Sequence, residues 1–136
     1  MATPQEALDA AQASWNAGDL DGYLRLYDDR IRLHGYAPEP MDKVAVRGFY
    51  EAIFAAFGSP PLEFHEVLWQ GDTATIRFTM GGTHVGEFMG VPPTGTEIEL
   101  NGITILRFDG DRVIERWSQA DMLGLLIQLG AVPAPA

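Results

Sequence analysis

Cysteine is absent from the 136-residue sequence, and basic residues are scarce. The absence of cysteine excludes disulfides, zinc–thiolate sites, iron–sulfur clusters and cysteine nucleophiles. Nine lysines and arginines face 19 aspartates and glutamates, which gives a formal net charge of −10. Such an acidic surface repels phosphate backbones and anionic membrane surfaces. We therefore expect neither nucleic acid nor a membrane as a partner.

Long apolar runs are also missing. No stretch approaches the ~18 apolar residues of a membrane-spanning helix, and no charged-then-apolar leader opens the sequence. We expect a cytoplasmic protein, and the lack of cysteine is consistent with that compartment. Hydrophobic residues make up 46% and charged residues 21%, which is typical of a globular chain. The length favours a single domain over residues 1–136, with residues 131–136 as a flexible tail.

The first part of the sequence has helical periodicity. Thr3, Pro4 and Glu6 form the pattern of a capping box, and a glycine ends the helix that follows. The next helix carries Tyr23 and Tyr27 at the spacing of one apolar face. The predicted elements are a helix from Pro4 to Gly18, a second from Asp19 through Tyr27, a short strand over residues 31–34 and a third helix from Asp42 to Gly58.

The periodicity changes from helical to extended at Leu62. Residues 73–80 alternate between apolar and polar side chains, as in a strand with one buried face. The predicted strands cover residues 62–70, 73–80, 97–108 and 112–120, and a helix over residues 122–129 closes the sequence. Because the strands follow the helices, the fold class is α+β: a bent antiparallel sheet with helices on one face and a cone-shaped pocket between them.

Asp121 lies at the joint between the last strand and the last helix. Its carboxylate is suited to cap the helix by accepting a bond from an early backbone N–H. Alternatively, the strand directs the carboxylate into an apolar interior, where its pKa would rise and the group could transfer protons. The local pattern leaves both interpretations open.

Three segments resemble the SnoaL-like polyketide cyclases, a branch of the ketosteroid isomerase and nuclear transport factor-like superfamily. They are Trp15-Asn16-Ala17-Gly18-Asp19-Leu20, the segment from Gly82 to Gly95 (GTHVGEFMGVPPTG), and the segment from Glu115 to Gly130 (ERWSQADMLGLLIQLG). With the matching order of elements, the resemblance covers nearly the whole chain. In this sequence Gly35-Tyr36-Ala37-Pro38 follows His34, where the family usually has an acidic residue and proline.

The resemblance implies a cone-shaped α+β barrel in which a strongly curved mixed or antiparallel sheet wraps around the N-terminal helices and encloses an apolar pocket. It implies an intramolecular aldol ring closure of a hydrophobic polyketide-like small molecule, with no metal or organic cofactor. By this resemblance Asp121 is the catalytic general acid/base. The resemblance also places His84 and His34 in the same pocket, as candidate catalytic residues that stabilise an enolate.

Further residues are candidates for binding the substrate. Trp117 shares strand parity with Asp121, and Gln119 is a second candidate donor to an enolate. The full set is Trp15, Tyr50, Phe54, Phe88, Met89, Trp117 and Gln119. The loop over residues 86–95, rich in glycine and proline, is a candidate lid over the pocket. No short spacing of histidines such as H-x-H occurs, so no metal site is expected.

Two alternative functions remain open. An epoxide hydrolase of the limonene type needs two carboxylates bridged by an arginine. Arg107 is suited to pair with Asp121, but Ile105 occupies the position that would need a second carboxylate. The other alternative is a non-catalytic domain of the same fold that binds a small ligand. In each case we expect a homodimer or homotetramer that associates through the outer face of the sheet.

Overall fold

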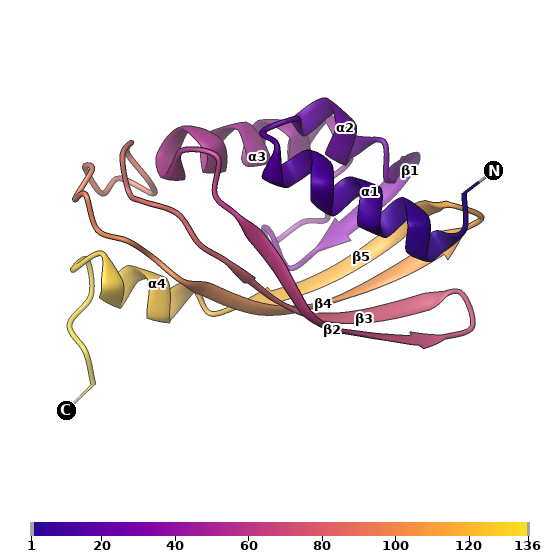
Figure 1. Cartoon of the computed structure of the whole chain (residues 1–136). Coiled ribbons are helices and arrows are strands. Elements are labelled where there is room, and N and C mark those ends of the chain that lie inside the picture. Colours follow the sequence, from indigo (N-terminus) through magenta and orange to yellow (C-terminus); the bar gives the residue numbers. More distant parts are fainter. Residues whose placement is uncertain (1, 136) are drawn as a thin grey trace.

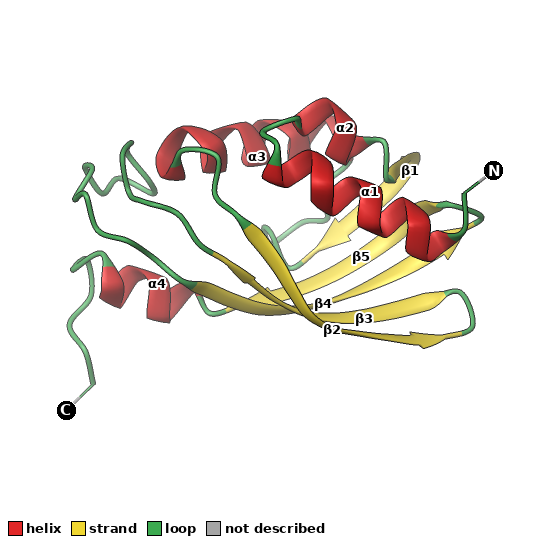
Figure 2. Ribbon diagram, in the orientation of Figure 1, coloured by secondary structure: helices red, strands yellow, loops and turns green. Residues whose placement is uncertain are grey.

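The structure is a computed structural model that describes residues 2–135. Ala136, the last residue of the predicted flexible tail, lies outside the described residues. The elements are α1 (Pro4–Asn16), α2 (Leu20–Leu24), β1 (Tyr27–His34), α3 (Lys43–Phe57), β2 (Leu62–Gln70), β3 (Thr73–Met80), β4 (Leu100–Asp109), β5 (Arg112–Ala120) and α4 (Met122–Gln128). Helices α1 to α3 lie over one face of the sheet, and α4 continues from the end of β5 (Figures 1 and 2).

The five strands form one mixed sheet in the order β1-β5-β4-β3-β2. The last four strands form the predicted antiparallel meander, and β1 joins its far edge by pairing parallel to β5. The sheet is open, because β1 and β2 are edges that do not pair with each other. The predicted α+β class and the curved mixed sheet are confirmed, but the barrel is not closed.

Local sequence signals set the helix boundaries. At α1, Glu6 N donates to Thr3 Oγ1 at 3.1 Å and Thr3 N donates to Glu6 Oε1 at 3.0 Å, which completes the predicted capping box. At α3, Asp42 accepts from Ala45 N at 2.8 Å. This helix ends at Gly58, whose φ of 58° lies in the left-handed region that favours glycine.

Two predicted boundaries were wrong near the start of the sheet. The second helix ends at Leu24 and does not reach Tyr27, which instead opens β1. Strand β1 is therefore longer than the predicted strand over residues 31–34. Tyr27 pairs with Val113 of β5 and is fully buried. Because Val113 is far from Tyr27 in the sequence, the local periodicity around Tyr27 cannot predict this pairing.

The connection between β3 and β4 also differs from the prediction. Strand β3 ends at Met80, before the predicted bend at Gly81 and Gly82, and β4 begins at Leu100 instead of residue 97. Residues 81–99 form a long connection with an isolated bridge between Thr83 and Glu97. This connection lies at the same end of the molecule as α4 (Figure 1).

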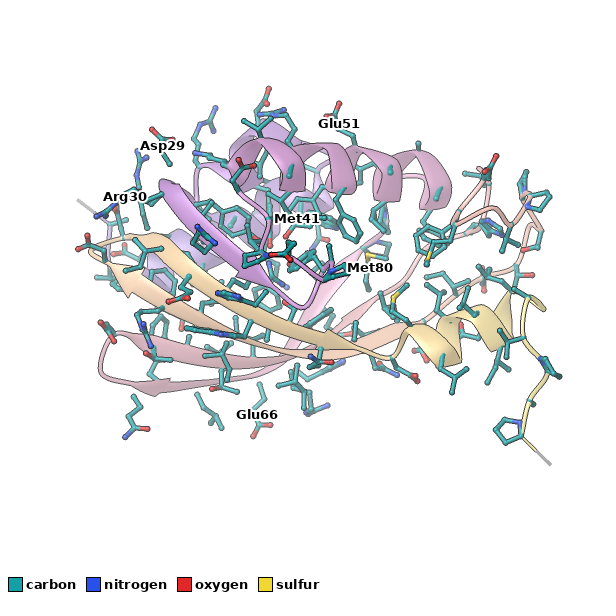
Figure 3. The ribbon with its side chains drawn as sticks, turned by 180° about the vertical axis from the view of Figure 1, so that it is seen from behind. Asp29, Arg30, Met41, Glu51, Glu66 and Met80 are labelled. Atoms are coloured by element: carbon teal, nitrogen blue, oxygen red, sulfur yellow. The ribbon has the colours of Figure 1, made fainter. Side chains whose placement is uncertain are left out.

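The interior lies between the helices and the inner face of the sheet. Alternate residues of β3 are buried there, from Ala74 through Met80, as the alternation predicted. Figure 3 shows Glu66 pointing away from the outer face of the sheet and Glu51 pointing away from α3, with Met80 between the two layers. The functional cavity forms in this interior layer.

Candidate active site

A cavity of about 410 Å³ lies in the layer between helices and sheet. This volume is within the range of small-molecule sites, ~300–1,000 Å³. Its lining comprises Trp15, Tyr23, Gly35, Tyr36, Phe49, Tyr50, Ile53, Leu62, Phe78, Met80, Phe88, Met89, Leu100, Arg116, Ser118, Gln119, Ala120 and Met122. Most of these side chains are aromatic or aliphatic, so the cavity suits a flat apolar molecule.

Arg116 is the charged side chain in this lining. The pleat of β5 directs Arg116 and Ser118 to the inner face, and Arg116 is only 9% exposed. Its Nε donates to Thr104 Oγ1 at 2.9 Å and to Ser118 Oγ at 3.0 Å. No ion pair within residues 2–135 involves Arg116. The cavity therefore has a positive charge on one wall.

All four tyrosines of the chain gather around this guanidinium. Arg116 Nη1 donates to the hydroxyls of Tyr23 at 2.8 Å, Tyr50 at 3.3 Å and Tyr27. Further contacts join Tyr27 Oη to Tyr50 Oη at 2.6 Å and Tyr50 Oη to Tyr36 Oη at 2.9 Å. The ring of Tyr36 also lies 5.8 Å from the guanidinium carbon. Arg116 and the four tyrosines form one polar cluster in an otherwise apolar interior.

The Arg116 guanidinium remains positively charged within this polar cluster. Burial raises the pKa of the Tyr27 and Tyr50 hydroxyls well above the ordinary value, so both are neutral at pH 7. Burial lowers the pKa of Arg116 while the tyrosines raise it, and the net direction is upward. Neither Tyr27 nor Tyr50 therefore ionises to neutralise the guanidinium, which stays protonated.

The end of β1 closes over this cluster through Gly35. Its φ is 93°, and a Cβ at this position would come within 2.0 Å of the Ser118 carbonyl oxygen. Only glycine allows the chain to turn this close to β5 and to deliver Tyr36 to the cavity. The Gly35-Tyr36 dipeptide, a departure from the family pattern, thus supplies one wall of the site.

The other end of the cavity is open. Phe88 and Met89 of the 81–99 connection line it; Phe88 is buried, whereas Met89 is 68% exposed. Ala120 and Met122 also line the cavity, one on each side of Asp121 in the sequence. The cavity lining therefore reaches the junction between β5 and α4.

Asp121 caps α4. Its Oδ1 accepts a bond from Gly124 N at 2.9 Å, and a Cβ on Gly124 would come within 2.2 Å of Oδ2. The cap interpretation is confirmed. The expected burial in an apolar interior does not occur: Asp121 is exposed and does not belong to the cavity lining. Its role as general acid/base stays a prediction.

His84 is fully buried but lies outside the cavity lining. Its Nδ1 lies 2.9 Å from Thr94 Oγ1 and accepts from Thr94 N at 3.2 Å, while its backbone N–H donates to Thr96 O at 2.9 Å. These bonds hold the two sides of the 81–99 connection together. Its Nε2 is buried without a hydrogen-bond partner among the described residues. The predicted catalytic role of His84 remains untested.

His34 and Trp117 lie on the outer face of the sheet, not in the cavity. Their rings stack at 5.4 Å, and His34 Nε2 lies 2.8 Å from Glu115 Oε2. The predicted position of Trp117 is corrected: β5 turns Arg116 and Ser118 inward, so Trp117 faces outward. Phe54 does not belong to the cavity lining either; its ring centroid lies 4.6 Å from that of Trp15, which does line the cavity.

Five of the predicted substrate-binding residues do border the cavity: Trp15, Tyr50, Phe88, Met89 and Gln119. Arg116, Tyr23 and Tyr36 were missed. Arg116 shares strand parity with Ser118 and Ala120, opposite to that assigned to the pocket, so a different choice of parity would have found it. Tyr36 gave no signal, because it follows a strand end inside an irregular loop.

The described part of the chain contains no metal-binding cluster, and no arginine of residues 2–135 forms an ion pair with Asp121. Within residues 2–135 no group of three or more histidine, aspartate or glutamate side chains is placed to hold a metal ion. Arg107 pairs with Glu115 at 3.2 Å on the outer face, and not with Asp121 as a limonene-type hydrolase would need. Across the same residues, no helix combines the length and apolar character needed to cross a membrane.

Comparison with solved structures finds the same fold along nearly the whole chain. AclR of Streptomyces galilaeus, a candidate hydroxylase, is 28% identical with a TM-score of 0.89 over 98% of this chain and 84% of its own. IdmH of Streptomyces antibioticus, a candidate polyketide cyclase, is 28% identical with a TM-score of 0.82 over 95% and 99% of the two chains. TsrD of Streptomyces laurentii is 25% identical with a TM-score of 0.83 over 94% and 95%.

A search of curated proteins finds no significant match. The profile of the SnoaL-like polyketide cyclases matches residues 5–129. This match spans α1 to α4 and includes every residue of the cavity lining. The chain therefore belongs to the SnoaL-like polyketide cyclase family.

Proposed function

We propose that this protein closes a ring in a hydrophobic polyketide-like small molecule by an intramolecular aldol reaction, without an organic cofactor or a metal. The observation that carries the proposal is the cavity itself. It is mostly apolar, it has the size of a small-molecule site, and its lining includes Ala120 and Met122, the two sequence neighbours of Asp121. Family membership supports the same class of reaction.

Asp121 is the proposed general acid/base. Its carboxylate takes a proton from a carbon next to a carbonyl, and the enolate carbon attacks a second carbonyl of the same molecule. The new carbon–carbon bond leaves an alkoxide, which takes the proton back from the Asp121 carboxyl. No atoms are gained or lost. An aspartate in water, with its ordinary pKa of ~3.9, is a weak base, and a substrate that covers the carboxylate and excludes water strengthens it.

The dimensions of β5 limit how the substrate lies. Asp121 is five residues beyond Arg116, roughly 16 Å along a strand at ~3.3 Å per residue. The two groups therefore act on opposite ends of one elongated substrate. Gln119 borders the cavity between them and is the proposed donor to the enolate oxygen. A flat polycyclic substrate fits this separation.

Replacing Asp121 with asparagine tests the proposal, with a panel of flat polyketide β-keto esters as substrates. Asparagine caps helices as well as aspartate does, so α4 and the fold should be retained. We expect at least a hundredfold loss of ring-closure rate, within the range of general acid–base contributions. Asp42→Asn is the matched control, because Asp42 caps α3 in the same way and does not line the cavity. Unchanged turnover in Asp121→Asn would refute the proposal.

A binding function without turnover is the second candidate. It is favoured by the exposure of Asp121 and by a described cavity lining that contains no carboxylate and no imidazole. Saturable binding of the same esters, which are recovered with their mass and number of rings unchanged, would support this candidate.

Similarity to AclR raises a third outcome. Hydroxylation would make the product one oxygen atom heavier than the substrate, whereas ring closure leaves the mass unchanged.

We also propose that two copies associate through the outer face of the sheet. Ile103 and Ile105 of β4 are 53% and 38% exposed there, and they pair directly with Arg77 and Thr75 of β3. Exposed isoleucines on a sheet face favour association with another apolar surface. Sedimentation velocity on the full chain distinguishes a dimer from a monomer.

A further inference from the structure

Among residues 2–135, no carboxylate pairs with Arg116 to balance its charge. Removing an ionised group from water is costly unless the protein or a ligand compensates it. The arginines with carboxylate partners, Arg30, Arg47, Arg77 and Arg107, are 45% to 67% exposed at the side chain. Arg116, which is buried, thus contacts hydroxyl groups, whereas these four exposed arginines contact carboxylates. This is the reverse of what charge burial alone would favour.

One side of the Arg116 fork is unused. Nε and Nη1 donate to hydroxyls of Thr104, Ser118 and three tyrosines. No described residue accepts from Nη2, yet Nη2 is not a fully buried orphan atom. Because Arg116 lines the cavity, we infer that the remaining exposure of Nη2 faces it. A guanidinium with a free edge is suited to a carboxylate or an ionised carbonyl oxygen.

The tyrosines supply a second donor. Four hydroxyl protons are available, and three contacts link the hydroxyls: Tyr23 to Tyr27, Tyr27 to Tyr50, and Tyr50 to Tyr36. Each contact uses one proton, so one hydroxyl proton remains. If the donors run from Tyr23 to Tyr36, that proton remains on Tyr36, and if they run the other way it remains on Tyr23. Both residues line the cavity, and Tyr36 is the less buried of the two, so its hydroxyl is the one we assign to the ligand.

We propose that Arg116 Nη2 and the Tyr36 hydroxyl form a binding site for one anionic oxygen group of a flat aromatic ligand, a carboxylate or an ionised enol conjugated to the ring. The inference rests on the proposed function, because it specifies the substrate class of the same cavity. The aromatic wall of Trp15, Phe49 and Phe78 contacts the rings. The polar cluster fixes which end of the ligand enters first.

The net charge of the protein makes this proposal easy to refute. At −10, the field of the whole molecule repels anions. A preference for an anionic ligand over its neutral isostere therefore cannot come from general electrostatic attraction. It has to come from a local cation, and Arg116 is the cationic side chain among the described lining residues.

Isothermal titration with two probes, 2-naphthoate and its methyl ester, measures this preference directly. For the unmodified chain we expect naphthoate to bind at least tenfold more tightly than the ester. In Arg116→Met, a substitution of similar length, that preference should vanish while the ester still binds. Arg112→Met is the matched control, since Arg112 is exposed at the start of the same strand. It should retain the full preference.

A second variant keeps the test decisive if Arg116→Met fails to fold. Tyr36→Phe removes only a half-buried hydroxyl, and should weaken naphthoate several-fold without changing ester binding. To distinguish a carboxylate from an ionised enol as the preferred anion, 2-naphthol is titrated at pH 7, where it is neutral, and at a pH above the pKa of its hydroxyl, where it is ionised. Tighter binding of the ionised form assigns the site to enolate-type oxygens as well as carboxylates.

The failures of the two proposals are distinguishable. Equal binding of ester and naphthoate, a preference that survives in Arg116→Met, or no binding of either compound would overturn the anion site. Binding of the ester without binding of naphthoate would also overturn the anion site, but it would still support an apolar substrate cavity. None of these titrations depends on turnover, so loss or retention of activity in Asp121→Asn is judged separately.

Discussion

Arg107 and Arg116 lie close together on neighbouring strands but face opposite sides of the sheet. On the outer face, Arg107 shares Glu115 with His34, and its guanidinium lies over Trp117. On the inner face, Arg116 is buried among hydroxyls, and no carboxylate of the described residues pairs with it. The exposed charge, which water would solvate in any case, has a partner within the protein. The buried charge has none, which is the arrangement expected where a ligand completes the site.

Placing a carboxylate next to Arg116 should have the largest effect on the difference between Arg116 and Arg107. In Ser118→Asp, the new carboxylate replaces a hydroxyl 3.0 Å from Arg116 Nε and neutralises the site from within. We expect naphthoate affinity to fall by more than tenfold. Ser118→Asn has nearly the same shape without the charge, and should lose much less. Equal losses in the two variants would show that bulk, not charge, controls binding.

The buried tyrosines predict a loss of stability in alkali. Burial raises the folded-state pKa of Tyr27 and Tyr50, whereas in the unfolded chain they ionise near pH 10. Their stabilising contribution is complete below about pH 10. Above it the unfolded state loses protons first, so the free energy of unfolding falls by up to ~1.4 kcal/mol per pH unit for each tyrosine.

Urea unfolding between pH 8 and pH 11 measures this slope. Tyr50→Phe should reduce the slope, because one titrating group is removed from the cluster. A slope that is unchanged in Tyr50→Phe would place the alkaline transition elsewhere in the molecule.

Removing the carboxylate partner of Arg107 should have the smallest effect on stability and on binding. Glu115→Gln removes the carboxylate that Arg107 and His34 share, but all three side chains are 29% to 47% exposed. Partly exposed pairs contribute ~1 kcal/mol or less. Urea unfolding at pH 7 should therefore change little, and naphthoate binding in the cavity should not change. A large loss of binding would mean that the two faces of the sheet are coupled.

Much of the fold followed from local sequence signals. The capping box at Thr3, the Asp42 cap and the alternation in residues 73–80 each gave an element that the structure contains. The errors at the start of the sheet have one cause, since they involve pairing between distant segments. Parallel pairing with β5 converts Tyr27 from a helix residue into the first residue of β1. No window of neighbouring residues contains that information.

The site was harder to predict than the fold. The aromatic wall was found in part, because Trp15 and Tyr50 lie on apolar helix faces and Phe88 lies in a family segment. The polar cluster was missed, since it joins tyrosines from three elements and a loop to an arginine on the last strand. A strand has two faces, and the wrong one was chosen for β5. That single choice placed Trp117 inside and Arg116 outside.

The parallel pairing of β1 with β5 also has a consequence for synthesis on the ribosome. All four tyrosines and the three N-terminal helices emerge well before Arg116 and its strand. Strand β5, the strand that pairs with β1, is therefore translated long after β1, and contacts between such distant segments form slowly. Until β5 leaves the exit tunnel, β1 lacks the strand that it pairs with in the sheet, and the interior below the helices lacks part of its cover. Nascent chains stalled before residue 112 should therefore be sensitive to protease and bound by chaperones.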